Sequence, residues 1–291
     1  MSFTTDTEIV LRMATPEDSQ ACGAICYKAF STLNTAHGFP CDFPHAEAAV
    51  GMLSTLFASP HFHCVVAEVG GRVVGSNCLD ERSAISGVGP ITVDPEVQNA
   101  GVGRRLMRAV MERAEAQGAP GVRLVQAAFH NRSLSLYTLL GFDPREPLSC
   151  VQGRTRDRSV PGCTVRAAQH RDVEACNAVS QRVHGFERRQ ELTEGIDQGT
   201  ALVVEHEGRV TGYASHLSFF GHAVAETTRD MQALIASADS FAGPGILVPT
   251  RNHELLRWCL ANGLRVVQPM TLMSMGFYQE PMGAWLPSVT F

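Results

Sequence analysis

Short apolar blocks and polar turns alternate along the chain, and their spacing predicts strands and helices in mixed order. Apolar runs bounded by turn residues predict strands at residues 64–68, 91–93, 121–128, 202–205 and 246–248. An amphipathic helix is expected directly after Gly103, and another carries the stretch from Leu136 to Phe142. This alternation predicts an α/β protein.

One segment, residues 91–106, combines a strand, a glycine loop and the start of a helix. The strand ends at Pro95, and the loop holds Gln98, Gly101 and Gly103. Because glycine has no Cβ, consecutive backbone N–H groups can converge on a diphosphate at the positive end of the helix. No Lys-Ser/Thr pair follows the glycines, and no acidic residue follows the next strand, so neither a nucleotide-hydrolysing P-loop nor an NAD site is indicated.

This loop and a second motif together resemble the GNAT superfamily of acyl-CoA-dependent N-acyltransferases. The family's phosphate loop, Gln/Arg-x-x-Gly-x-Gly/Ala, is matched from Gln98 to Gly103. Its later signature, an Asn followed by Tyr-x-x-x-Gly-Phe, is matched by Asn131 and by Tyr137 to Phe142. The close resemblance covers residues 65–142 and implies acetyl-CoA as co-substrate of an N-acetyltransferase.

The resemblance also implies roles for individual residues. Backbone groups of Ile91, Thr92 and Val93 are expected to face the pantetheine arm. The diphosphate is expected to bind, mainly through main-chain N–H groups, to Gln98, Asn99, Ala100, Gly101, Val102, Gly103 and Arg104. Asn131 is expected to cap its helix and to bond the pantetheine. Tyr137 is the expected catalytic residue, which donates a proton or hydrogen bond to the departing thiolate.

The general base stays open in the sequence. Glu81, Asp80, His130 and Asp94 are candidates, and a relay of water molecules is the alternative. Asp94, directly before Pro95, fits a turn cap better than a base.

The acceptor side is expected in the loop of residues 37–45. Phe39 and Asp42 suit a cationic amine held by ring and charge contacts, with Glu81 as a further candidate. A packed loop explains Phe43 better than amine binding does.

Four patterns recur in the same order in the second half of the chain. Residues 10–18 return as 164–172, 37–39 as 184–186, 71–75 as 208–212, and 136–142 as 256–264. We therefore expect two tandem GNAT domains, at residues 1–155 and 160–291, each a mixed, mostly antiparallel sheet flanked by helices. The polar stretch 152–162 has the composition of a linker.

The second copy lacks the chemistry of the first. No Gln-x-x-Gly-x-Gly pattern lies between Gly212 and Gly263, and Cys259 stands where the first copy has Tyr137. The Gly243–Gly245 stretch precedes a strand instead of opening a helix. We expect a degenerate GNAT-like domain that binds no CoA and shapes the acceptor cleft.

The composition of the chain bears on its partners, its cysteine chemistry and its location in the cell. The 291 residues carry a net charge of −5, which argues against nucleic acid or an anionic membrane as the main partner. Nine cysteines without a Cys-x-x-Cys pair indicate neither a metal site nor a disulfide framework. No apolar stretch approaches the ~18 residues of a membrane helix, and the polar start has no signal pattern, so a cytoplasmic protein is expected.

A small or amino-acid-like amine is the expected acceptor; a non-catalytic acyl-CoA sensor and a protein N-acetyltransferase are the alternatives.

Overall fold

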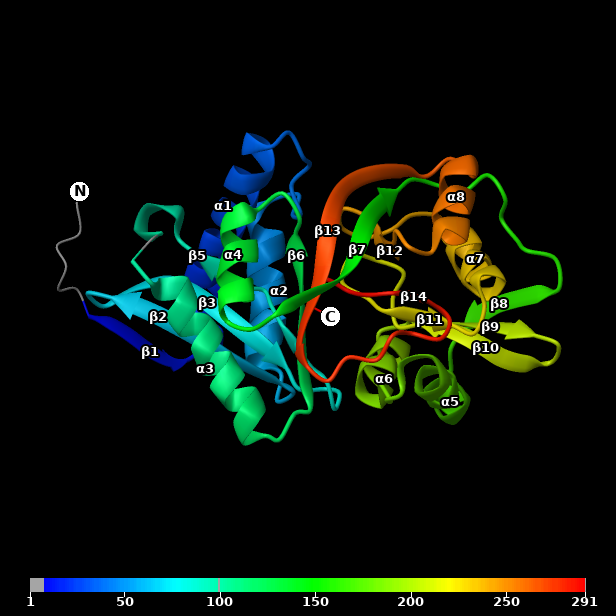
Figure 1. Ribbon diagram of the computed structural model, residues 1–291, viewed down its shortest axis with the longest axis horizontal. Helices are drawn as coiled ribbons and strands as arrows, with labels where there is room; N and C mark the ends of the chain where they lie inside the picture. The colour runs from blue at the N-terminus through cyan, green and yellow to red at the C-terminus, as the bar shows by residue number, and fades with distance from the viewer. Residues whose placement is uncertain (1–7, 99, 291) are drawn as a thin grey trace. The chain divides into compact units, whose positions relative to one another are not determined.

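The computed structural model describes residues 8–98 and 100–290, and the chain divides into two compact units (Figure 1). Unit 1 comprises Met1–Glu81 and Ser86–Val122, and unit 2 comprises Arg82–Ile85 and Arg123–Phe291. The strand β6 (Gly121–Ala127) begins in unit 1 and continues in unit 2. None of the helices in the described parts of the chain is both long and apolar enough to cross a membrane.

Unit 1 is an antiparallel sheet with three main helices. Its strands run in the order β1-β2-β3-β4, and β5 also pairs with β3. Along the chain the elements are β1 (Ile9–Met13), the 3₁₀ turn η1 (Pro16–Asp18), α1 (Ser19–Ala36), α2 (Ala46–Ala58), β2 (Phe62–Val69), β3 (Arg72–Asp80), β4 (Ser86–Val88), β5 (Thr92–Val93), η2 (Pro95–Val97) and α3 (Val102–Ala116).

The helix α3 is held by its apolar face. Leu106, Met107, Val110 and Ala114 are buried at helical spacing, and the helix lies across β2 and β3 (Figure 1). Burying a side chain such as Leu106 contributes about 1.5–3 kcal/mol. The start of α3 is thereby fixed at the end of the sheet where β5 runs into η2.

An irregular ladder joins β3 to β4 and β5. Leu79 pairs with Val88, and Ser76 pairs with Thr92. The two paired positions are three residues apart in β3 but four residues apart in the segment that contains β4 and β5. One extra residue is therefore accommodated between β4 and β5, as in a β-bulge. A Cβ on Gly75 would lie 2.5 Å from the carbonyl oxygen of Thr92, so only glycine permits the approach of β3 to β5.

A disulfide joins Cys64 of β2 to Cys78 of β3, which are direct register partners. The cysteine pattern of the sequence did not indicate this pairing. The spacing of the two cysteines does not reveal the pairing, because it depends on the register of the two strands.

Unit 2 contains two strand arrays. One runs in the order β6-β13-β7-β12 and the other in the order β14-β11-β10-β9-β8. The elements after β6 are α4 (Asn131–Leu139), β7 (Asp143–Gln152), β8 (Cys163–Ala167), η3 (His170–Asp172), α5 (Val173–His184), α6 (Arg189–Asp197), β9 (Leu202–His206), β10 (Arg209–Ala214), β11 (Ala223–Ala225), α7 (Thr228–Ser237), β12 (Ile246–Pro249), α8 (His253–Ala261), β13 (Arg265–Gly276) and β14 (Ala284–Leu286). A core of buried apolar residues surrounds α7, including Val204, Met231, Leu234, Val248 and Leu255.

The order of elements repeats along the chain. The series β1-η1-α1-α2-β2-β3-β4 is followed by α3-β6-α4-β7, and the same series returns as β8-η3-α5-α6-β9-β10-β11, then α7-β12-α8-β13. Only the first series has β5 and η2, the elements that lead into the glycine loop. The repeated order confirms the twofold arrangement predicted from the sequence.

The two compact units do not coincide with the repeats, and strand pairing explains why. The last strand of the first series, β7, lies between β13 and β12 of the second, and it is antiparallel to both. The end of the first repeat therefore belongs by its contacts to unit 2. The division expected at residues 155–160 stays a prediction, and the contacts divide the chain near residue 122.

Candidate active site

The glycine loop lies at the start of α3, as its sequence predicts. Gly101 occupies the N-cap position with φ +83°, a left-handed conformation that favours glycine, and Val102 opens the helix. A Cβ on Gly101 would meet nothing within 4 Å, so the space beside this residue is open. Gln98 ends η2, Ala100 is exposed, and Asn99 lies outside the described residues.

The first turn of α3 suits an anion. Among the residues that the structure describes, no side chain caps this helix, and its first turn holds no acidic residue. The free N–H groups of a helix N-terminus and its dipole favour negative charge. Arg104 is exposed, whereas the Arg105 guanidinium donates to the carbonyl oxygen of Ile9 at 2.7 Å and anchors the helix to β1.

The turn that leads into this loop is anchored by Asp94. Its carboxylate accepts hydrogen bonds from the Glu96 backbone N–H at 3.1 Å and from Lys28 and Arg72 at 3.2 Å each. Burial raises the pKa of Asp94, but the Glu96 bond and the two cations outweigh it and hold the pKa below its ordinary value. Asp94 is therefore an ionised turn cap, as the sequence suggested, and a poor proton acceptor.

The side chains of the other candidate bases are also hydrogen-bonded or buried. Arg113 donates to both carboxylate oxygens of Glu81, at 2.7 and 3.0 Å. The ring of His130 lies with Nδ1 3.0 Å from the Ser133 hydroxyl, and Asp80 is buried in β3. None of these geometries singles out a base.

Asn131 and Tyr137 lie on α4, in unit 2. Asn131 is the first residue of the helix and is exposed, while His130 holds the N-cap position. The expectation that Asn131 caps the helix was wrong, because the helical turn begins one residue earlier than the motif suggests. Its carbonyl oxygen accepts a bond from the Ser135 hydroxyl at 2.8 Å.

Tyr137 is buried, with 7% of its surface exposed, and packs edge-on against Phe142 at 6.3 Å between ring centroids. Burial raises the pKa of its phenol well above the ordinary value. The side chain therefore remains protonated at neutral pH, so it can donate a proton or hydrogen bond but is no base.

The predicted residues thus fall into two groups. Around the start of α3, unit 1 holds Thr92, buried in β5, with Ile91, the half-buried Val93 and the loop from Gln98 to Arg104. Unit 2 holds Asn131 and Tyr137 on one helix, six residues apart. The glycine loop opens α3 as its motif predicts, whereas Asn131 already lies inside α4.

The expected acceptor loop is organised by Asn34, a buried residue of α1. Its side-chain amide donates to the carbonyl oxygen of Pro40 at 3.0 Å and to the Asp42 carboxylate at 3.2 Å, and its backbone carbonyl accepts from the Phe39 N–H. Phe43 is buried against Phe30, with ring centroids 6.2 Å apart. Phe43 is thus a packing residue, while Phe39 and Asp42 are partly exposed.

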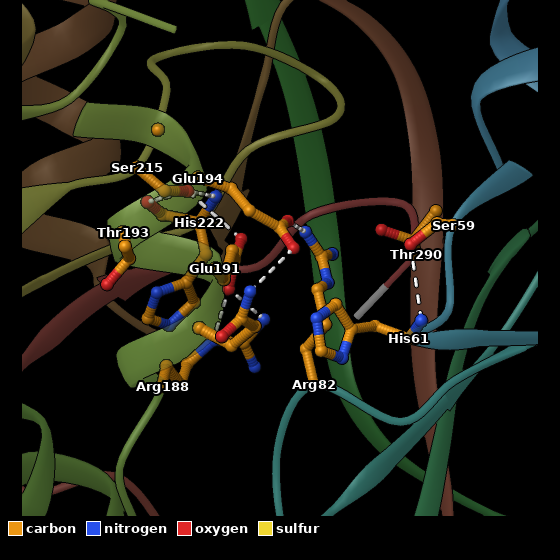
Figure 2. A network of polar contacts seen from close by, with 12 residues as sticks. Ser59, His61, Arg82, Arg188, Glu191, Thr193, Glu194, Ser215, His222 and Thr290 are labelled. Carbon is orange, nitrogen blue, oxygen red and sulfur yellow. Dashed lines mark hydrogen bonds and ion pairs between the residues drawn. The ribbon is translucent and has the colours of Figure 1, made fainter. Parts of the chain in front are cut away.

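A buried polar network in unit 2 was not anticipated (Figure 2). The Arg188 guanidinium donates to Glu191 at 2.7 Å, and the Ser215 hydroxyl donates to the same carboxylate at 3.0 Å. All three residues are buried. Nearby along the chain, Glu194 accepts from Arg82 at 2.7 Å. These residues come from three separate segments of the chain, so no sequence pattern could have pointed to them.

Two further buried groups belong to unit 2. The rings of His184 and His222 face one another with 3.1 Å between their Nε2 atoms. Arg123 is fully buried between the rings of Phe186 and Tyr278, at 5.2 and 5.1 Å from their centroids. Burial lowers the pKa of Arg123 to about 10.

The helix that corresponds to α3 in the second repeat is α7, and its N-terminus is closed. The Thr227 side chain caps it by accepting from the Asp230 N–H at 3.2 Å, and Asp230 places a carboxylate in the first turn. An anion would meet a satisfied donor and a negative charge there. This end of α7 therefore lacks the glycine N-cap and the open, acid-free first turn that make α3 suitable for a phosphate.

Comparisons with known proteins identify the family of the chain. Residues 27–142 match the Acetyltransferase (GNAT) family. The N-alpha-acetyltransferase RimI of Mycobacterium tuberculosis is 32% identical over 146 residues, which cover 48% of this chain and 82% of the relative.

Solved structures extend the likeness to the whole chain. A candidate acetyltransferase of Pyrococcus horikoshii has a TM-score of 0.73 at 18% identity, covering 98% of this chain and 95% of that chain. A GCN5-related N-acetyltransferase of Sphaerobacter thermophilus reaches 0.62 at 15% identity, over 94% and 96%. A tandem GNAT protein from the clavulanic acid biosynthesis pathway reaches 0.57 at 16%, over 92% and 98%. These structures share the fold of the chain, including its twofold arrangement.

Proposed function

The chain belongs to the GNAT acetyltransferase family, and from this premise we propose that it transfers an acetyl group from acetyl-CoA directly to a small or amino-acid-like amine. One observation carries the proposal. In the part of the chain that the structure describes, no side chain caps the start of α3 behind Gly101, which lies in a turn that only glycine adopts freely, and the first helical turn has no acidic residue. That is the chemistry required to hold the diphosphate of CoA.

In this proposal the loop from Gln98 to Arg104 holds the diphosphate, and the backbone of residues 91–93 lies along the pantetheine. Asn131 donates to the pantetheine amides. The acceptor nitrogen attacks the thioester carbonyl, the carbon–sulfur bond breaks, and the nitrogen gives up a proton to water or to a base. Tyr137, which is protonated at neutral pH, donates to the departing thiolate and regains its proton from solvent.

The acceptor preference rests on the loop between α1 and α2. Asn34 bonds the Asp42 carboxylate through its side chain and the Phe39 N–H through its backbone carbonyl, and both Asp42 and Phe39 are partly exposed. A carboxylate and an aromatic ring in one loop suit a protonated amine before it loses its proton. We further propose that residues 1–155 carry all of the CoA chemistry and that residues 160–291 contribute the second, CoA-free repeat.

A second candidate acceptor is the α-amine of a peptide or protein. It is favoured by the 32% identity to RimI, an N-alpha-acetyltransferase, over most of that relative's length.

The test is release of free CoA thiol from acetyl-CoA across a panel of small amines, amino acids and peptides with free N-termini. The proposal predicts turnover with a small amine that is lost in Gly101→Val. Turnover confined to peptide N-termini would replace the acceptor class with the second candidate. CoA binding without turnover on any of the three classes would contradict the enzyme.

A further inference from the structure

A cluster of three potential metal ligands lies in unit 2, on elements that the proposed chemistry does not use. Cys163 is the first residue of β8 and His206 is the last residue of β9, and the two are register partners across the antiparallel pair. Asp230 reaches the same place from the first turn of α7. One ligating atom of each side chain lies within 4.8 Å of the other two.

The distances in the cluster fit one common ion. The Cys163 Sγ lies 3.7 Å from Oδ1 of Asp230, and the His206 Nδ1 lies 3.2 Å from the same oxygen. Around a tetrahedral Zn²⁺ with ordinary bond lengths, sulfur and oxygen are separated by about 3.5 Å and nitrogen and oxygen by about 3.3 Å. The sulfur and the nitrogen lie within 4.8 Å of each other, so small side-chain rotations bring a single position to bonding distance from all three atoms.

The carboxylate is already oriented for this role. Thr227 donates its hydroxyl to Oδ2 of Asp230 at 2.6 Å, which leaves Oδ1 facing Cys163 and His206. The Asp230 side chain is 1% exposed. Outer hydrogen bonds of this kind fix the ligands of protein metal sites.

We propose that Cys163, His206 and Asp230 bind one divalent transition-metal ion, with Zn²⁺ the preferred metal. A thiolate and an imidazole select Zn²⁺ over Mg²⁺ or Ca²⁺, which take oxygen ligands. The side chain of His206 is 29% exposed and Cys163 is half-buried, so water can reach the fourth position. Upon binding, the Cys163 thiol gives up its proton to solvent.

A positive charge also lies close to the cluster. Arg229 donates to the carbonyl oxygen of Pro161 and bonds Cys163; this bond lowers the pKa of the Cys163 thiol, although burial and then Asp230 raise that pKa overall. The site would tie the edge strand β8 to β9 and α7. Zn²⁺ should therefore stabilise the folded chain by mass action.

The experiment uses the full chain, reduced and freed of metal, titrated with Co²⁺ as the spectroscopic probe and then with Zn²⁺. The proposal predicts one Co²⁺ per chain with a thiolate-to-cobalt charge-transfer band, which Zn²⁺ displaces. Cys163→Ser and His206→Gln should weaken binding at least ~10-fold and abolish the Zn²⁺-dependent rise in Tm. The control Cys41→Ser removes an exposed cysteine and should bind like the wild type.

Two results would overturn the site. One is the absence of a charge-transfer band in the wild-type chain at saturating Co²⁺. The other is a Cys163→Ser protein that is folded by circular dichroism and binds Co²⁺ as tightly as the Cys41→Ser control. Because neither readout involves acetyl transfer, the outcome does not depend on the proposed function.

Discussion

Arg12 at the end of β1 holds the carboxylate of Asp18 at two points, with both nitrogen–oxygen distances at 2.7 Å. The Asp18 carboxylate also accepts from the backbone of Thr15, and Arg12 pairs in addition with Glu68 of β2. This bonding holds the pKa of Asp18 below its ordinary value, chiefly through the Arg12 hydrogen bond. The pair fixes the angle at which the first strand passes into the first helix.

The same device recurs with Arg166 and Asp172. The two nitrogen–oxygen distances are 2.7 and 2.9 Å, the backbone of Gln169 takes the place of Thr15, and Glu205 takes the place of Glu68. Each pair spans six residues between a strand and a 3₁₀ turn. Two copies of so specific a local arrangement support a tandem repeat in which the structural framework persists while the phosphate loop is present only once.

Substitution of Gly101 should impair acetyl-CoA binding. In Gly101→Val the branched side chain would fill the open space where the diphosphate is expected, so KM for acetyl-CoA should rise at least ~10-fold. The positive φ adds a strain of about 1–3 kcal/mol, so steady-state kinetics should be measured together with a thermal melt.

Gly118 provides the matched control. It has φ +71°, follows the other end of α3, and its Cβ would meet nothing within 4 Å. Gly118→Val should therefore cost a similar amount of stability and leave KM unchanged. Equal KM values in the two variants would contradict a phosphate site at Gly101.

Removing the Tyr137 hydroxyl should slow the chemical step. Tyr137→Phe keeps the packing against Phe142 and should lower kcat roughly 10- to 1,000-fold, more than it changes KM, because the bond strengthens as the thiolate forms. Cys259→Ala, on the corresponding helix α8, should have wild-type turnover. A Cys259→Ala protein as impaired as Tyr137→Phe would refute the assignment.

The sequence predicted what is encoded locally. The Arg–Asp spacing, the strand-to-helix glycine loop and the repeat order depend on neighbours in the chain, and the structure has all three. Other features depend on which strands meet. The disulfide between Cys64 and Cys78, the position of β7 between β13 and β12, and the network around Glu191 all join distant segments. Strand register and tertiary packing determine these contacts, and a periodicity cannot reveal them.

Breaking the buried pair of Arg188 and Glu191 should destabilise the fold. In Glu191→Gln a buried cation loses its carboxylate partner, at a cost of about 3–5 kcal/mol in the free energy of unfolding, measured in urea. Glu174, whose ion pair with Arg189 is exposed, is the control. Glu174→Gln should have little effect, and an equal loss in both variants would contradict the importance of burial.

The two buried histidines should make stability depend on pH. Burial holds the pKa of both His184 and His222 well below the ordinary value of 6.5, so the unfolded chain takes up protons that the folded chain excludes. Stability is therefore fully present above pH ~6.5 and is lost as the pH falls, by up to about 1.4 kcal/mol per pH unit for each group. Burial lowers the pKa of His63 and His216 in the same direction.

Urea unfolding between pH 7 and pH 5 checks this dependence, above the range in which most carboxylates take up protons. The slope of the unfolding free energy against pH gives the number of protons taken up on unfolding, and His184→Gln should lower this number by about one. A wild-type stability that stays constant or rises toward pH 5 would show that these histidines are not held neutral by folding.

The most direct test of the account is calorimetric titration of the full chain with CoA. The N-terminus of α3 is open to a phosphate and that of α7 is closed by Thr227 and Asp230, so the account predicts one CoA per chain. Binding should be lost in Gly101→Val and kept in Gly118→Val. Two CoA per chain, or one that binds Gly101→Val as tightly as the wild type, would contradict it.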